Sequence, residues 1–144
     1  MYEDYTRQSL PTRQYRELLG SAIYVFNSNN AFLIENTLRC DDIGKYDWYD
    51  LIDLESGELK KRVHEVVSSR SGTEIEDLFV SIVKMRNRII HSFSITDENG
   101  EQILATKERA KEGNRQFHIT KEYLLEFIEL NQRLSDLLYA LRGF

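Results

Sequence analysis

The chain has 144 residues, a formal net charge of −5, 41% hydrophobic and 30% charged residues. This length fits one domain, residues 1–144, and the acidic balance argues against a general nucleic-acid coat protein without excluding a small basic cleft. There is no run of 18 apolar residues, so no contact with a membrane is expected. Cys40 is the only cysteine, and the N-terminus lacks the basic start and apolar run of a signal peptide, which predicts a cytoplasmic protein.

Three long helical regions are expected before residue 92. Apolar residues recur at helical spacing over 12–40 and again over 46–69, where Ser56-Gly57 could interrupt the second region. Thr73 and Glu76 form a capping-box pattern at the start of a third helix, which should run to about residue 91.

The pattern changes after that helix. Two runs of strand-forming residues flank Asn99-Gly100, which predicts a β-hairpin over about 93–105 closed by a type I′ turn. A further short strand is expected over 116–119, and Thr120 is placed to cap a final helix. The expected fold is mostly α: a four- to five-helix bundle with a short β-hairpin inserted before the last helix.

Several polar residues lie on helix faces that should be core. Arg86 is eleven positions after Ile75, which puts it about 20° away on a helical wheel, in the middle of the apolar stripe. An unpaired buried guanidinium is very costly, so Arg86 needs either a partner or a solvated cleft. Asn29, Asn36 and Asn131 also fall on apolar stripes. We expect these side chains to line one polar pocket.

His91 ends the same helix as Arg86. Asn87 and His91 are four residues apart and share a face. Arg86 and His91 are five apart, about 140° around an ideal helix, so they converge only if the helix loosens at its end or two protomers meet there.

The segment Arg86-Asn87-Arg88-Ile89-Ile90-His91 resembles the R-x(4–6)-H signature of the HEPN superfamily, including the polar residue directly after the arginine. The resemblance implies a helical bundle with metal-independent endoribonuclease activity and no cofactor. It implies an active site at a homodimer interface, with catalytic roles for Arg86, Asn87 and His91. It also implies a toxin, abortive-infection or anti-phage role, with an antitoxin or another defence protein as a partner.

These residue types suit RNA cleavage without a metal. The ribose 2′-hydroxyl attacks the adjacent phosphate, which requires a proton acceptor, a proton donor and compensation of the phosphorane charge. Imidazole titrates near neutral pH and can accept or donate the proton, and a guanidinium forms bidentate contacts with phosphate oxygens. Asn87 can orient the imidazole or hold a phosphate oxygen. DNA lacks the 2′-hydroxyl and should not be cut.

Other residues are assigned by position and charge. We expect Lys84, Arg88 and Asn131 to contact RNA. Two basic runs could guide a phosphate backbone: Lys60, Lys61 and Arg62 in one, and Lys107, Arg109, Lys111 and Arg115 in the other. No residue pattern predicts a metal site.

Two other hypotheses remain open. In the first, the chain is a non-catalytic HEPN-like module for dimerisation or for binding a protein partner. In the second, it is an unrelated helical bundle, with Arg86 salt-bridged inside one protomer and His91 pointing into solvent.

Overall fold

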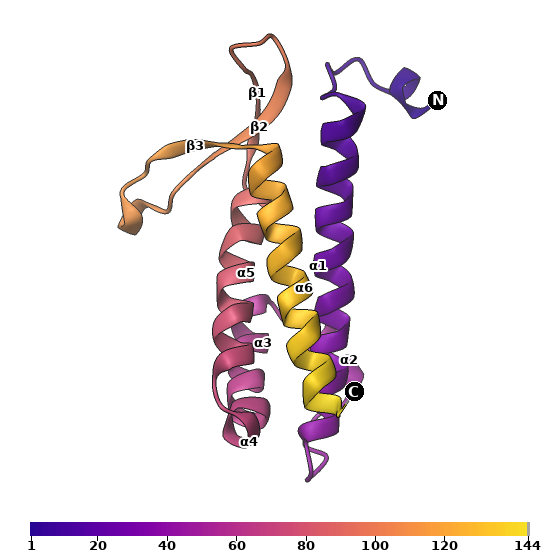
Figure 1. The fold of residues 1–144 in the computed structure, drawn as a ribbon, viewed down its shortest axis with the longest axis vertical. Helices are drawn as coiled ribbons and strands as arrows, with labels where there is room; N and C mark the ends of the chain where they lie inside the picture. The colour runs from indigo at the N-terminus through magenta and orange to yellow at the C-terminus, as the bar shows by residue number, and fades with distance from the viewer. Residues whose placement is uncertain (144) are drawn as a thin grey trace.

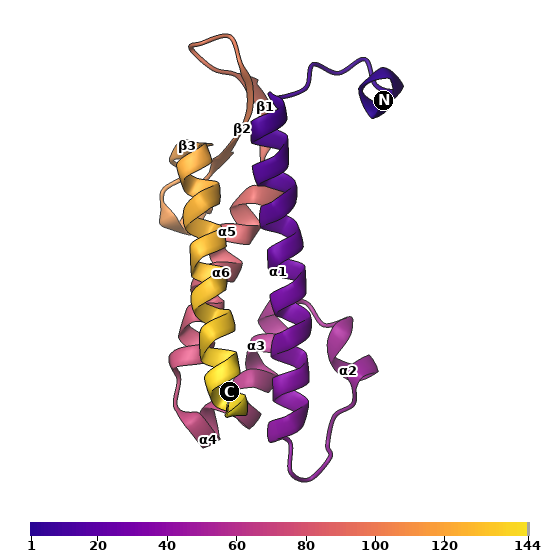
Figure 2. The same ribbon diagram turned by 45° about the vertical axis from the view of Figure 1, so that its right-hand side comes forward.

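The computed structural model describes residues 1–143, and its body is built from three long helices. These are α1 (Arg13–Cys40), α5 (Glu74–Ile90) and α6 (Lys121–Arg142), which lie side by side in Figures 1 and 2. The hydroxyl of Thr12 accepts a hydrogen bond from the Tyr15 amide, and that of Thr120 accepts one from the Tyr123 amide. Helices α1 and α6 therefore begin at side-chain caps, and the predicted cap at Thr120 is confirmed.

The second helical region is divided into shorter pieces. They are α2 (Trp48–Ile52), α3 (Ser56–Val63), a π-helical turn (His64–Ser68) and α4 (Ser69–Ser71). The interruption lies at residues 53–55, so Ser56 starts a helix instead of breaking one. Gly72, with φ +84°, turns the chain toward α5.

The core lies between the helices and is apolar. Its largest fully buried side chains include Phe79 and Ile82 of α5, Leu33 of α1, and Phe127 and Leu134 of α6. Burying each large apolar side chain contributes about 1.5–3 kcal/mol to the stability of the fold, and this burial holds the helices together.

A three-stranded antiparallel sheet lies at one end of the bundle, between α5 and α6 in the chain (Figure 1). Its strands β1 (Phe93–Thr96), β2 (Gln102–Lys107) and β3 (Gln116–Ile119) pair in chain order. The Tyr15 hydroxyl donates to the Ile119 carbonyl at 2.7 Å and accepts from the Leu104 amide at 3.1 Å, which fixes the sheet to α1. The expectation of a mostly α fold with a short hairpin before the last helix is confirmed, and the third strand is present.

Two local predictions are wrong. Thr73 does not cap α5: its hydroxyl donates to the Asp77 carboxylate, while Glu76 contacts His64 and Ser68 on the neighbouring π-helical turn. The Glu76 carboxylate, which the capping box requires, is instead bound by His64 and Ser68 from another element.

The hairpin turn is also not type I′. Gly100 has φ +78°, but no positive φ occurs at Asn99. The Asp97 carboxylate instead accepts from the Asn99 and Glu101 amides at 2.9 Å each. This side-chain acceptor organises a wider loop that needs only one left-handed residue.

Candidate active site at the C-terminal end of α5

The last turn of α5 holds the predicted motif. The His91 amide donates to the Asn87 carbonyl at 2.9 Å, and His91 then leaves helical geometry at φ −95°, ψ 42°. The Thr106 hydroxyl of β2 donates to the His91 carbonyl at 3.3 Å. The helix end is therefore anchored to the sheet, while the imidazole itself is exposed.

Arg86 is half-buried, and its charge has no carboxylate partner within residues 1–143. One terminal nitrogen donates to the Ser56 hydroxyl at 3.0 Å, and the guanidinium carbon lies 5.0 Å from the centre of the Phe26 ring. Its Nε is buried without an acceptor. Burial lowers the pKa of the Arg86 guanidinium, since the charged form loses hydration. The unrelated-bundle hypothesis predicted a salt bridge at Arg86, and the structure shows none there within residues 1–143.

Arg86, Asn87 and His91 line one hollow of about 570 Å³, which we call the motif hollow. Its wall also includes Asn27 and Asn30 of α1. Both Arg86 and His91 line this hollow, although no hydrogen bond joins their side chains within the described residues, and the His91 amide keeps its helical bond to Asn87.

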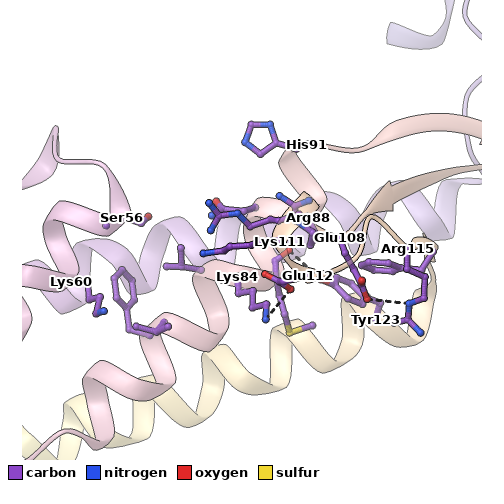
Figure 3. Close-up of a pocket in the computed structure, with 18 residues that line it drawn as sticks. Ser56, Lys60, Lys84, Arg88, His91, Glu108, Lys111, Glu112, Arg115 and Tyr123 are labelled. Carbon is purple, nitrogen blue, oxygen red and sulfur yellow. Dashed lines mark hydrogen bonds and ion pairs between the residues drawn. The ribbon is translucent and has the colours of Figure 1, made fainter.

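A second hollow, of about 790 Å³, adjoins the first, and Asn87 and His91 line both. We call it the basic groove. Figure 3 shows Lys84, Arg88 and Lys111 gathered in it, with His91 at the rim and projecting away from them. Its walls come from α3, α5 and the connection between β2 and β3.

Positive charge dominates the basic groove. Six lysines and arginines line it against two glutamates, in a chain whose net charge is −5. The cations are Lys60, Lys84, Arg88, Arg109, Lys111 and Arg115, and the anions are Glu108 and Glu112. Members of both basic runs of the sequence thus meet here, which gives the groove the charge that a phosphate backbone requires.

Three of these cations already have partners. Lys84 Nζ lies 3.2 Å from the Glu112 carboxylate, and Arg115 Nε lies 3.1 Å from that of Glu108 (Figure 3). Arg88 donates to the Lys107 carbonyl, which ties α5 to β2. Arg88 is therefore first a structural link between helix and sheet, with the rest of its guanidinium facing the groove.

Comparison with protein-family models, characterised proteins and solved structures finds no match. No helix within residues 1–143 combines the length and the apolar character that a membrane crossing needs.

Asn131 is not at this site, and its predicted RNA contact is wrong. Its side chain is 0% exposed and lines neither hollow. The Asn29 amide donates to the backbone oxygen of Asn131 at 2.6 Å and to its side-chain oxygen at 3.1 Å, while Asn131 donates to the Phe127 carbonyl. Asn36 donates to a carbonyl of its own helix. Asn29 and Asn131 thus satisfy each other between α1 and α6, Asn36 bonds within α1, and none of the three lines either hollow.

Ser56 and Phe26 are the residues that sequence reasoning missed. They position Arg86 from α3 and α1, far away in the chain. The only signal was that α3 begins at Ser56, which places its hydroxyl at a helix end, free to reach a neighbour.

Proposed function

We propose that this protein is a metal-independent endoribonuclease of the HEPN type. The proposal depends on one observation: the guanidinium of Arg86, which no carboxylate of residues 1–143 neutralises, lines the same hollow as Asn87 and the exposed imidazole of His91. An arginine held by a hydroxyl and a ring face keeps its charge available for an anion. A phosphate is an anion that guanidinium recognises well.

The reaction uses these groups in named roles. A base removes the proton of the ribose 2′-hydroxyl, whose oxygen attacks the adjacent phosphorus. The bond from phosphorus to the 5′-oxygen breaks, and an acid protonates that oxygen. The products are a 2′,3′-cyclic phosphate and a 5′-hydroxyl. His91 serves as acid or base, Arg86 stabilises the phosphorane charge, and Asn87 orients the imidazole or holds a phosphate oxygen.

One histidine per protomer lines the motif hollow. The reaction has two proton transfers, so a homodimer that brings two copies of His91 together would supply both. The exposure of the imidazole leaves it accessible to a second copy. In this proposal the cell restrains the nuclease through an antitoxin or another defence protein, and release of that restraint stops growth.

The test is cleavage of a fluorescent single-stranded RNA in the presence of EDTA. We expect cutting by the native protein, a cyclic phosphate product, no cutting of the matching DNA, and loss of activity in His91→Ala and Arg86→Ala. His118→Ala is the matched control, because His118 is exposed on β3 and lines neither hollow. A protein that cuts no RNA, with Arg86→Ala disturbing dimerisation and His91→Ala silent, would establish the non-catalytic module instead.

A further inference from the structure

The carboxylates of the basic groove come from the same short segment as three of its cations. The connection between β2 and β3 contains Glu108, Arg109, Lys111, Glu112 and Arg115. Each carboxylate is paired with a groove cation, one on α5 and one on the connection itself. In the free protein, the carboxylates of Glu108 and Glu112 therefore occupy part of the surface that would otherwise bind an anion.

We propose that the basic groove is a subsite for single-stranded RNA flanking the cleaved bond, and that Glu112 occupies the position that an RNA phosphate takes on Lys84. This inference depends on the proposed function, since it names where the substrate of that reaction continues. Asn87 and His91 line both hollows, so a strand with its reacting phosphate at Arg86 runs directly into the groove.

The exposure of the ion pair allows this exchange. The side chains of Lys84 and Glu112 are 65% and 30% exposed, and an exposed pair of this kind contributes only about 0–1 kcal/mol. A strand that contacts several cations also releases condensed counterions, which favours binding more strongly than a single surface pair opposes it. Breaking the Lys84–Glu112 ion pair therefore costs less free energy than one good phosphate contact contributes.

The floor of the groove favours a nucleotide chain over a bare anion. The rings of Phe117 and Tyr123 line it and are partly exposed, whereas Phe79, which also lines it, is buried. Burial raises the pKa of Tyr123 to about 12, so its hydroxyl stays neutral, and it donates to the Met85 carbonyl at 3.3 Å. A neutral, partly apolar floor under a charged rim fits bases and sugars below phosphates.

The experiment measures binding without cleavage. The probe is a fluorescein-labelled uridine decamer with 2′-O-methyl groups on every ribose, followed by fluorescence anisotropy against salt. Glu112→Gln should tighten binding about two- to fivefold, the range for releasing an exposed ion pair. Lys84→Ala should weaken it about fivefold or more and lower the salt slope by about 0.7. When Glu112→Gln is combined with Lys84→Ala, it should raise affinity less than it does in the native protein.

Two matched controls lie on the exposed side of α6. Glu129→Gln and Arg133→Ala remove one charge of each sign outside both hollows, and neither should change affinity beyond the effect of net charge. Unchanged affinity in both Glu112→Gln and Lys84→Ala would overturn the subsite even if the protein cuts RNA. Displacement of the probe by an equal concentration of a glutamate decamer would overturn the RNA assignment in favour of an acidic peptide. If His91→Ala no longer cuts RNA but still binds the probe, the groove binds RNA independently of the residue that carries out the reaction.

Discussion

Replacing Arg86 with methionine separates the charge of this side chain from its packing. The methionine keeps an unbranched apolar stem against Phe26 and removes the guanidinium. The fold then loses the hydrogen bond from the charged guanidinium to Ser56, about 1.5–3 kcal/mol, and the contact with the ring, about 0.5–1 kcal/mol. It regains the cost of a buried Nε without an acceptor, about 1–3 kcal/mol, and of a partly dehydrated charge.

These contributions nearly cancel, so stability should change by less than about 1 kcal/mol, or roughly 3 °C in Tm. Activity should change far more. Removing one preorganised donor to a charge that develops in the transition state costs about 10²–10³ in rate, or roughly 2.7–4 kcal/mol. The two quantities differ enough for one variant to tell a catalytic arginine from a structural one.

Initial cleavage rates and urea unfolding midpoints, measured on the same preparations, make the comparison. Arg86→Lys adds a second point: it keeps the charge but loses the planar fork, so partial activity is expected. Ser56→Ala should retain most of the stability and lose part of the rate, because it only positions Arg86. A variant Arg86→Met that is destabilised by more than about 2 kcal/mol, with rates falling only in proportion to the folded fraction, would refute the reasoning.

Three further expectations concern the fold. Tyr15→Phe removes the partner of the buried Ile119 carbonyl and of the partly buried Leu104 amide, and should cost about 1–3 kcal/mol in the free energy of unfolding, read from urea denaturation. Asn131→Ala should cost about 1–2 kcal/mol through its lost contact with Asn29, with RNA affinity by anisotropy unchanged, since it lines neither hollow. Hydrogen bonds from Lys45 and from a tyrosine hydroxyl lower the pKa of Glu65 to about 2 from 4.5. Its stabilisation is therefore present above pH 4.5 and is lost as the pH falls toward 2, and Glu65→Gln should flatten that part of an acid-unfolding curve.

Long periodic segments were predictable, because a helix that buries one face repeats its apolar residues regardless of its partners. The ranges 12–40 and 73–91 were nearly right for that reason. Local hydrogen-bonding choices were not predictable in the same way. Glu76 had a plausible partner at its own helix start, yet His64 and Ser68 on another element capture it. Short-range signals fail where a distant side chain competes for the same group.

The site shows the same division. Asn87 and His91 share a helix face, as their spacing of four indicates, whereas the helical wheel separates Arg86 from His91 although all three line one hollow. A helical wheel gives the direction of the Asn131 side chain but not its partner. In the structure, Asn29 of α1 donates to that side chain, so Asn131 links two helices and does not contact a ligand. Whether a polar residue on an apolar stripe lines a pocket or satisfies a neighbour depends on the facing helix, which one sequence does not reveal.

The basic groove illustrates why net charge is a poor guide to what a protein binds. The chain carries 24 acidic and 19 basic residues, yet six of the 19 line one groove beside two carboxylates. A phosphate within a Debye length, about 8–10 Å at physiological salt, responds to this local excess, while the acidic remainder is screened. Under the proposed function, this local positive charge would attract RNA to the groove, which adjoins the hollow lined by Arg86.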